Sequence, residues 1–271
     1  MRKDVLAATC VILVAVLAGG TSAAARVSRS SLAGTSEVVV PRGQPVQIAF
    51  VASSDFPAFT HDIRNGILMA IEQHPMIRGY SIQLNEFDPP CFSGPDPAAA
   101  NAAVASAIVS NPQNTAVIGH FCSQGFAPAL PIYEDADVVT ISGSATAADL
   151  PNLGPDVFNR TAVEDPNFDA WYALVGALPS DLAFQQDYQS EFGAAPLGFT
   201  DLYFDAASLL LRDLQQVSRI VNDHLVIDRA ALASAVRNTT NFQGVTCTIT
   251  LDPSTGNRVD DPSALAGCTE G

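Results

Sequence analysis

The chain has 271 residues, a formal net charge of −15 at pH 7 and an apolar fraction of 48%. Such an acidic surface repels nucleic acid and anionic membranes, so the composition excludes both as expected partners. The predicted strands and helices occupy about 200 residues, which is enough chain to bury a single sizeable core.

The first 25 residues have the pattern of a secretory signal peptide. A basic start at Met1-Arg2-Lys3 precedes an apolar run from Val5 to Gly20, and small residues at 21–25 supply a cleavage site. The apolar run is short for a membrane span, which takes about 20 residues, so an uncleaved anchor is the less favoured alternative. We expect a periplasmic or extracellular protein, with residues 26–45 as a mobile leader.

Helical segments separate a series of apolar segments that are rich in β-branched residues or alternate with period two. Strands are expected at 46–52, at 80–87, from 116, from 138 and at 157–161, and helices at 60–73, 96–110 and 123–135. This alternation predicts βαβ units and a parallel sheet flanked by helices, which is an α/β fold. After residue 161 the alternation ends, and helices at 180–192, 198–217 and 228–238 precede a strand at 244–251.

Two of the predicted strands run into small residues with side-chain oxygens. Ser123 follows the strand that starts at 116, and Ser144 and Thr146 follow the strand that starts at 138. In an open α/β sheet, ligands bind beyond the carboxyl ends of the strands, and the start of a helix offers free N–H groups to an anion. These residues therefore predict a cradle for the carboxylate and amine of a small zwitterion.

Two other interpretations of Ser123 stay open. It can cap the helix that begins there. It can also be a hydrolase nucleophile beside His120, but the strained turn of that motif requires Gly where this chain has Phe121. We assign no catalytic residue and do not expect an enzyme.

Four cysteines remain after the predicted cleavage, and an even number in an oxidising compartment favours two disulfides. Three connectivities are open, and proximity in the sequence favours Cys91–Cys122 and Cys247–Cys268. A metal site at His120 and Cys122 lacks the paired spacing of known metal motifs. No metal and no cofactor are expected.

At these residues the chain resembles the leucine/isoleucine/valine-binding proteins, which are type I periplasmic solute-binding proteins of ABC importers. The most specific matches are Val117–Ser123, Ile132–Asp135, and Ile141-Ser142 with Ala145-Thr146-Ala147. The resemblance implies a Cys91–Cys122 disulfide, and it implies that Ser123 and Thr146 hold the ligand carboxylate and amine. It assigns Ser144 a mainly backbone contact, and it places Phe59 where the family often has a pocket-lining Tyr.

The resemblance covers 46–160 well and 184–257 moderately, and it implies a fold in which most of one lobe is missing. Family members clamp the ligand between two α/β lobes, whereas the segment for the second lobe is largely absent here. The expected organisation is a first lobe at 46–161, a shortened crossover at 162–179, returning helices and a last strand at 180–257, and a tail at 258–271.

The implied function is that of a substrate-binding component that takes a small amino acid or amide to the membrane permease of an ABC importer. Branched-chain or related amino acids are the expected ligands, with binding weakened by the missing lobe. The alternative is a one-lobe sensory or protein-interaction module without a role in transport.

A missing lobe is also expected to leave aromatic side chains exposed around Ser123 and Thr146. The expected residues are Phe56, Phe59, Phe126, Phe168 and Trp171. A contiguous apolar patch on the order of several hundred Å² usually marks a binding surface or an aggregation liability, so the chain is expected to be either self-associated or marginally stable as a monomer. A two-fold homodimer through this cleft face is the commonest way to cover it.

Overall fold

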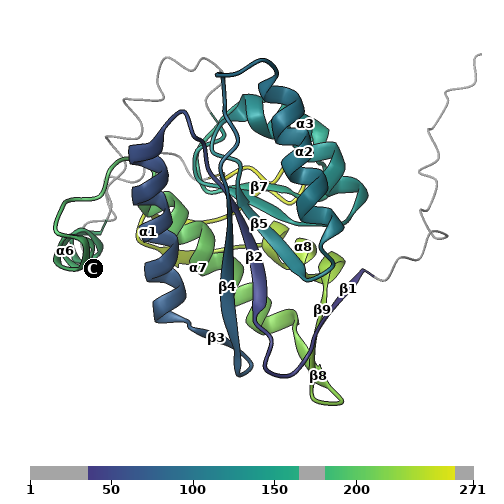
Figure 1. The fold of residues 1–271 in the computed structure, drawn as a ribbon. Helices are drawn as coiled ribbons and strands as arrows, with labels where there is room; N and C mark the ends of the chain where they lie inside the picture. The colour runs from purple at the N-terminus through teal and green to yellow at the C-terminus, as the bar shows by residue number, and fades with distance from the viewer. Residues whose placement is uncertain (1–35, 165–180, 260–271) are drawn as a thin grey trace, which may run out of the picture. The chain divides into compact units, whose positions relative to one another are not determined.

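A six-stranded, mainly parallel sheet forms the centre of the protein in a computed structural model, which describes residues 36–164 and 181–259 (Figure 1). The described residues form one compact unit. The strand order is β3-β4-β2-β5-β6-β7, and only β3 runs antiparallel to its neighbour. The strands are β2 (Val46–Val51), β3 (Met76–Ile77), β4 (Tyr80–Phe87), β5 (Asn114–Gly119), β6 (Thr140–Ser142) and β7 (Phe158–Arg160).

The central strands are apolar because helices cover both faces of the sheet. Every residue of β5 is buried, and so are five of the six residues of β2. Successive side chains of a strand point to opposite faces. Ile48 and Phe50 therefore enter one core, and Ala49 and Val51 enter the other. The predicted parallel sheet is confirmed.

Helices from both halves of the sequence cover the sheet. The first face carries α1 (Pro57–Gln73), α6 (Leu182–Phe192), α7 (Thr200–Val217) and α8 (Arg229–Arg237). The second face carries α2 (Pro97–Ser110), α3 (Ser123–Asp135) and the short α4 (Leu150–Leu153). Figure 1 shows α1 and α7 on one side of the sheet and α2 and α3 on the other. The late helices thus complete the fold that the early strands begin.

The prediction of a mobile leader at 26–45 is wrong for its second part. Glu37–Val40 form β1, which pairs antiparallel with β9 (His224–Asp228). Val38 and Val40 point into the core beside Leu225 and Ile227, because the segment alternates with period two. Strand β8 (Arg219–Val221) completes this three-stranded sheet.

The strand expected at 244–251 is instead a hairpin of β10 (Phe242–Gly244) and β11 (Cys247–Ile249). The buried Asp205 carboxylate of α7 fixes its turn by accepting hydrogen bonds from the N–H groups of Val245, at 2.8 Å, and Thr246, at 2.9 Å. The Thr246 hydroxyl donates to the same carboxylate. These long-range hydrogen bonds interrupt the strand at a point where the local sequence indicates no turn.

Helix α1 begins at Pro57 rather than at Thr60 as predicted. Proline suits the first turn of a helix because an N–H group there has no helical partner. The Thr60 hydroxyl donates instead to the carbonyl of Ser53, at 3.0 Å, and so closes the loop after β2.

The predicted signal peptide, most of the predicted crossover at 162–179 and nearly all of the predicted tail at 258–271 lie outside the described residues. Within the described part of the chain, no helix is long and apolar enough to cross a membrane.

Replacing Gly66 with Ala is expected to destabilise the fold, because α1 and α7 meet at this residue. An added Cβ would lie 2.7 Å from the Thr200 carbonyl oxygen, which is backbone. Overpacking of this kind typically costs about 1–3 kcal/mol in the free energy of unfolding. Urea denaturation measures it. Helix propensity alone would give a gain of about 1 kcal/mol, so a stabilised variant would contradict the close packing.

Candidate functional site

The carboxyl ends of β2, β5 and β6 lie level at one edge of the sheet. Val51 is in register with Gly119, and Ile118 is in register with Ile141. The loops that follow these strands therefore meet at this edge. Two of them carry the predicted site residues: Ser123 follows β5, and Ser144 and Thr146 follow β6.

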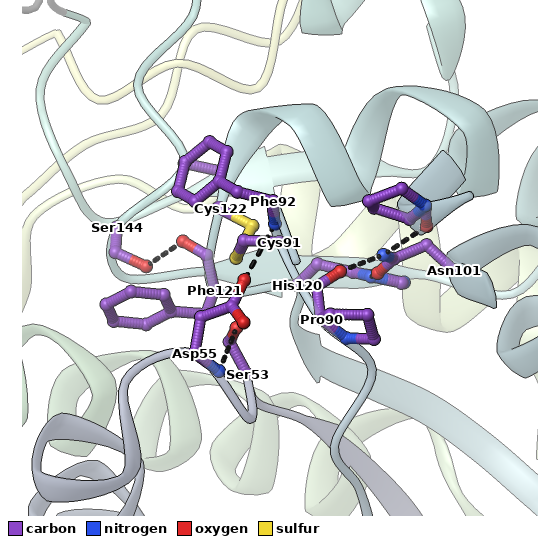
Figure 2. The surroundings of a disulfide bond; sticks show 12 residues. Ser53, Asp55, Pro90, Cys91, Phe92, Asn101, His120, Phe121, Cys122 and Ser144 are labelled. Carbon is purple, nitrogen blue, oxygen red and sulfur yellow. Dashed lines mark hydrogen bonds between the residues drawn. A yellow bond between two sulfur atoms is a disulfide. The ribbon is translucent and has the colours of Figure 1, made fainter. Parts of the chain in front are cut away.

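A disulfide between Cys91 and Cys122 fastens this edge, as the sequence predicts (Figure 2). It joins the loop after β4 to the residue before α3, with the two Cα atoms 6.1 Å apart. A cross-link over 31 residues stabilises a fold by about 3–4 kcal/mol on the chain-entropy model. Cys247 is described and buried, but Cys268 lies outside the described residues, so the second pair stays a prediction.

Ser123 contacts the loop that follows β6. It is the first residue of α3, and its Oγ accepts a hydrogen bond from the Ala147 N–H at 3.2 Å. The N-cap residue of α3 is Cys122, and no side chain caps this helix. Ser123 therefore links the loop after β5 to the loop after β6 rather than serving as a helix cap.

Ser144 has a hydroxyl that already bonds within the protein. Its Oγ donates to the Phe121 carbonyl at 2.5 Å (Figure 2). The same Oγ lies 2.8 Å from the Tyr203 hydroxyl. Burial raises the pKa of Tyr203 to about 12, so this phenol stays protonated. The Ser144 side chain fixes the loop and leaves little capacity for a ligand.

Thr146 is the contrasting case. Its side chain is 5% exposed, and its hydroxyl takes part in no hydrogen bond among the described residues. The carbonyl groups on either side, of Ala145 and Ala147, both accept from Nη1 of Arg160, at 3.2 and 3.0 Å. The loop therefore holds a positioned hydroxyl that no protein group in the described ranges uses.

Arg160 is a site residue that the sequence pattern did not single out. It ends β7, its side chain is fully buried, and its Nη2 donates to the Glu164 carboxylate at 2.7 Å. Burial lowers the pKa of Arg160 to about 10, against the attraction of Glu164. The guanidinium is therefore cationic at neutral pH. The sequence feature that could have identified Arg160 is a cationic residue at the end of a strand whose other residues are buried.

Phe59 belongs to an aromatic cluster at this edge, which we define as Phe56, Phe59, Phe92, Phe121 and Phe199. The Phe59 ring lies 6.3 Å from that of Phe121 and 6.1 Å from that of Phe199. The Phe56 ring lies 5.3 Å from Phe121 and 6.1 Å from Phe92. Phe92 is 53% exposed, whereas Phe56 and Phe59 are half-buried. An apolar surface thus borders the loops.

The prediction that Phe126 is exposed is wrong. It is fully buried between α3 and the sheet, where its ring stacks on His120 with the centroids 5.2 Å apart. The Phe126 side chain points toward the sheet because of the helix period, which places Phe126, Leu130 and Tyr133 on the buried stripe of α3. Phe168 and Trp171 lie outside the described residues.

His120 has a structural role. Its Nδ1 lies 2.8 Å from Asn101 Oδ1 (Figure 2). Its Nε2 lies 3.0 Å from the Tyr133 hydroxyl, so both ring nitrogens are engaged. Burial lowers the pKa of His120 to about 3. The ring is neutral and is not bonded to Ser123, and the geometry gives no support to a hydrolase mechanism.

A large groove lies away from these loops. It has a volume of about 1140 Å³, and α1, α6, α7 and β10 line it. Ser123, Ser144, Thr146 and Phe59 are not among its lining residues. Within the described ranges, no group of three His, Cys, Asp or Glu side chains could hold a metal ion.

Comparison with known proteins confirms the predicted resemblance. The chain is 35% identical over 116 residues to the Leu/Ile/Val-binding protein of Escherichia coli K12, a match that covers 42% of this chain and 30% of that protein. It is 33% identical over 175 residues to the leucine-specific-binding protein of Salmonella typhimurium, covering 60% of this chain and 46% of that one. The chain thus spans less than half the length of these relatives, and no protein-family profile matches it.

Solved structures confirm the fold. A branched-chain amino acid ABC transporter protein from Rhodospirillum rubrum aligns with a TM-score of 0.66 at 14% identity, over 80% of this chain and 96% of that one. A substrate-binding protein from Streptococcus pneumoniae, in complex with isoleucine, aligns with a TM-score of 0.61 at 15% identity, over 79% and 94%. The described residues therefore have the fold of a type I periplasmic-binding-protein lobe.

Acidification is expected to lower stability through His120. The unfolded side chain takes up a proton near pH 6.5, whereas the pKa of the folded one lies at about 3. The stabilising contribution is complete above pH 6.5 and is lost as the pH falls toward 3, by about 1.4 kcal/mol per pH unit. Urea denaturation between pH 7 and 4 measures this loss, and the His120→Gln variant should show a flatter profile.

Subtracting the pH profile of His120→Gln from that of the wild type isolates the contribution of His120, because other titrating groups affect both profiles equally. Burial raises the pKa of Asp205 to about 6, so this carboxyl favours folding as the pH falls from 6 toward 3.8. That contribution is common to the wild type and the variant. Parallel pH profiles would show that the folded protein tolerates a protonated His120.

Proposed function

We propose that this chain is the extracytoplasmic substrate-binding component of an ABC importer for branched-chain or related amino acids. It acts by recognition without catalysis, and it passes its ligand to a membrane permease. The names of its relatives support this proposal. One of the two proteins described above binds leucine, isoleucine and valine, and the other is specific for leucine. The signal-peptide pattern supports an extracytoplasmic location.

The observation that carries the proposal is the difference between the three hydroxyl side chains. Ser144 is engaged by Phe121 and Tyr203, and Ser123 accepts the Ala147 N–H. Thr146 lies in the same loop as Ser144 and Ala147, and its hydroxyl has no hydrogen-bond partner among the described residues. This loop is at the carboxyl edge of the sheet, where ligands of α/β proteins bind. Ser123 can still donate its own proton. Together, Thr146 and Ser123 can bind a ligand carboxylate.

A single lobe covers only one side of such a ligand. Small-molecule pockets usually bury about 70–90% of the ligand surface, which one open sheet edge does not achieve. We expect weak binding, with a Kd in roughly the millimolar range, equivalent to about −4 kcal/mol.

A second candidate function is a one-lobe interaction module that pairs through the cleft face. The exposed Phe92 ring beside the half-buried Phe56 ring favours it, because a contiguous apolar patch usually marks an interaction surface. A homodimer through this face buries the exposed and half-buried rings of the aromatic cluster, which are Phe92, Phe56 and Phe59.

Replacing Thr146 with Val is expected to weaken leucine binding about tenfold, which is the loss of about 1.4 kcal/mol for a hydrogen bond to a charged group. Titration followed by NMR chemical shifts suits weak affinities. The matched control is Thr140→Val, because the Thr140 hydroxyl donates to the Val157 carbonyl inside the fold at 3.1 Å. Equal affinities of wild type and Thr146→Val would remove Thr146 from the site.

Replacing Phe92 with Asp is expected to abolish dimerisation, because a charge in an apolar interface is costly to desolvate. Light scattering at increasing concentration should show the wild type gaining mass while Phe92→Asp stays a monomer. Met76→Asp is the control, since Met76 is 59% exposed on β3, beside the amino end of β4. A wild type that stays monomeric at every concentration would reject the dimer.

A further inference from the structure

Arg160 lies directly behind the loop that presents Thr146. A single nitrogen, Nη1, donates to the carbonyl groups of Ala145 and Ala147 at 3.2 and 3.0 Å. These carbonyls precede and follow Thr146, so one guanidinium holds the peptide on both of its sides. The side chain has no exposed surface and cannot touch a ligand itself. It can act only through the loop and through its charge.

The charge of Arg160 is only partly neutralised. Among the described residues its one ion pair is with Glu164, whose side chain is 38% exposed and also accepts from the Asn257 amide at 2.7 Å. An exposed carboxylate is screened by water, whereas the guanidinium has low-dielectric surroundings and faces the Phe158 ring at 5.5 Å. The Nε atom is buried and has no hydrogen-bond partner among the described residues. A positive potential therefore remains at the loop.

We propose that Arg160 positions Thr146 and makes this site select an anionic group, a carboxylate, over a neutral group of the same shape. This inference rests on the proposed function, because it concerns the same site. Arginine is suited to the task, since its planar fork reaches two carbonyls with one nitrogen and a carboxylate with another. A lysine would supply the charge without the fork.

Arg237 offers a matched comparison. It is also buried, at 6% exposure, and it donates to Asn159 Oδ1 at 3.0 Å and to the Phe158 carbonyl at 2.5 Å. Both arginines thus support β7, but Arg237 makes no hydrogen bond to the loop of Thr146. Loss of Arg237 reports the general cost of losing a buried arginine at this strand.

The test compares L-leucine with L-leucinamide, which differ in the carboxylate alone. Dissociation constants of both are measured by NMR titration for the wild type, Arg160→Gln, Arg160→Lys, Glu164→Gln and Arg237→Gln. A unit charge within about 12 Å at an effective dielectric of about 20 changes an equilibrium about tenfold. The preference for leucine should therefore fall about tenfold in Arg160→Gln and stay unchanged in Arg237→Gln.

Two further variants separate charge from position. Glu164→Gln removes the counter-charge, so the preference for leucine should rise by about twofold or more. This variant alters a partly exposed side chain, and it carries the test if Arg160→Gln does not fold. Arg160→Lys should keep most of the preference while weakening both ligands, because the charge remains and the clamp is lost.

Amide hydrogen exchange in the ligand-free protein tests the positioning role separately. Exchange at residues 144–148 should be about tenfold faster in Arg160→Gln than in Arg237→Gln, with the amides of β5 as the reference for global stability. Equal exchange in the two variants would overturn the positioning role. An unchanged preference in both Arg160→Gln and Glu164→Gln would overturn the charge role.

If the wild type binds neither compound, the proposed function fails and the charge role fails with it. The exchange measurement then still decides the positioning role. If leucine binds to the wild type and the preference does not respond to Arg160, only the inference fails.

Discussion

The return of α7 to the first half of the chain is the constraint on which the site depends. The ring of Tyr203 packs so closely on Gly143 that an added Cβ would lie 2.6 Å from it. The Tyr203 hydroxyl then reaches Ser144, and Ser144 reaches the Phe121 carbonyl. One side chain from the second half thus fixes both loops at the sheet edge. Without α7 the strands would still have their pattern, but the loops would lack a common support.

Much of the fold could be predicted from the sequence because its signals are local. Buried β-branched runs identify β2 and β5, and the helix period identifies the stripe of α7. The Cys91–Cys122 pair is favoured by proximity in the sequence and implied by the family resemblance. The approach of the loops of Ser123 and Ala147 needs only the rule that carboxyl ends of parallel strands share an edge.

The missed features depend on partners that are distant in the sequence. Strand β1 is ordered by β9, and the β10–β11 turn is fixed by Asp205 of α7. No local pattern shows which of several short valine-rich segments will find a partner strand. Arg160 was missed for the same reason, because it donates hydrogen bonds to two carbonyl groups that precede it by 15 and 13 residues. A side chain's direction is decided by packing, not by its neighbours in the chain.

The pairing of β1 with β9 has a consequence for the order in which the polypeptide completes itself during synthesis. The first strand waits for a partner that begins at His224, and the apolar face of α1 waits for α7. Contacts of such long sequence separation form slowly, because a large loop must close before any of them stabilises the fold. A nascent chain that ends before α7 leaves much of one face of its sheet uncovered. It is thus a natural client for chaperones that bind apolar surfaces.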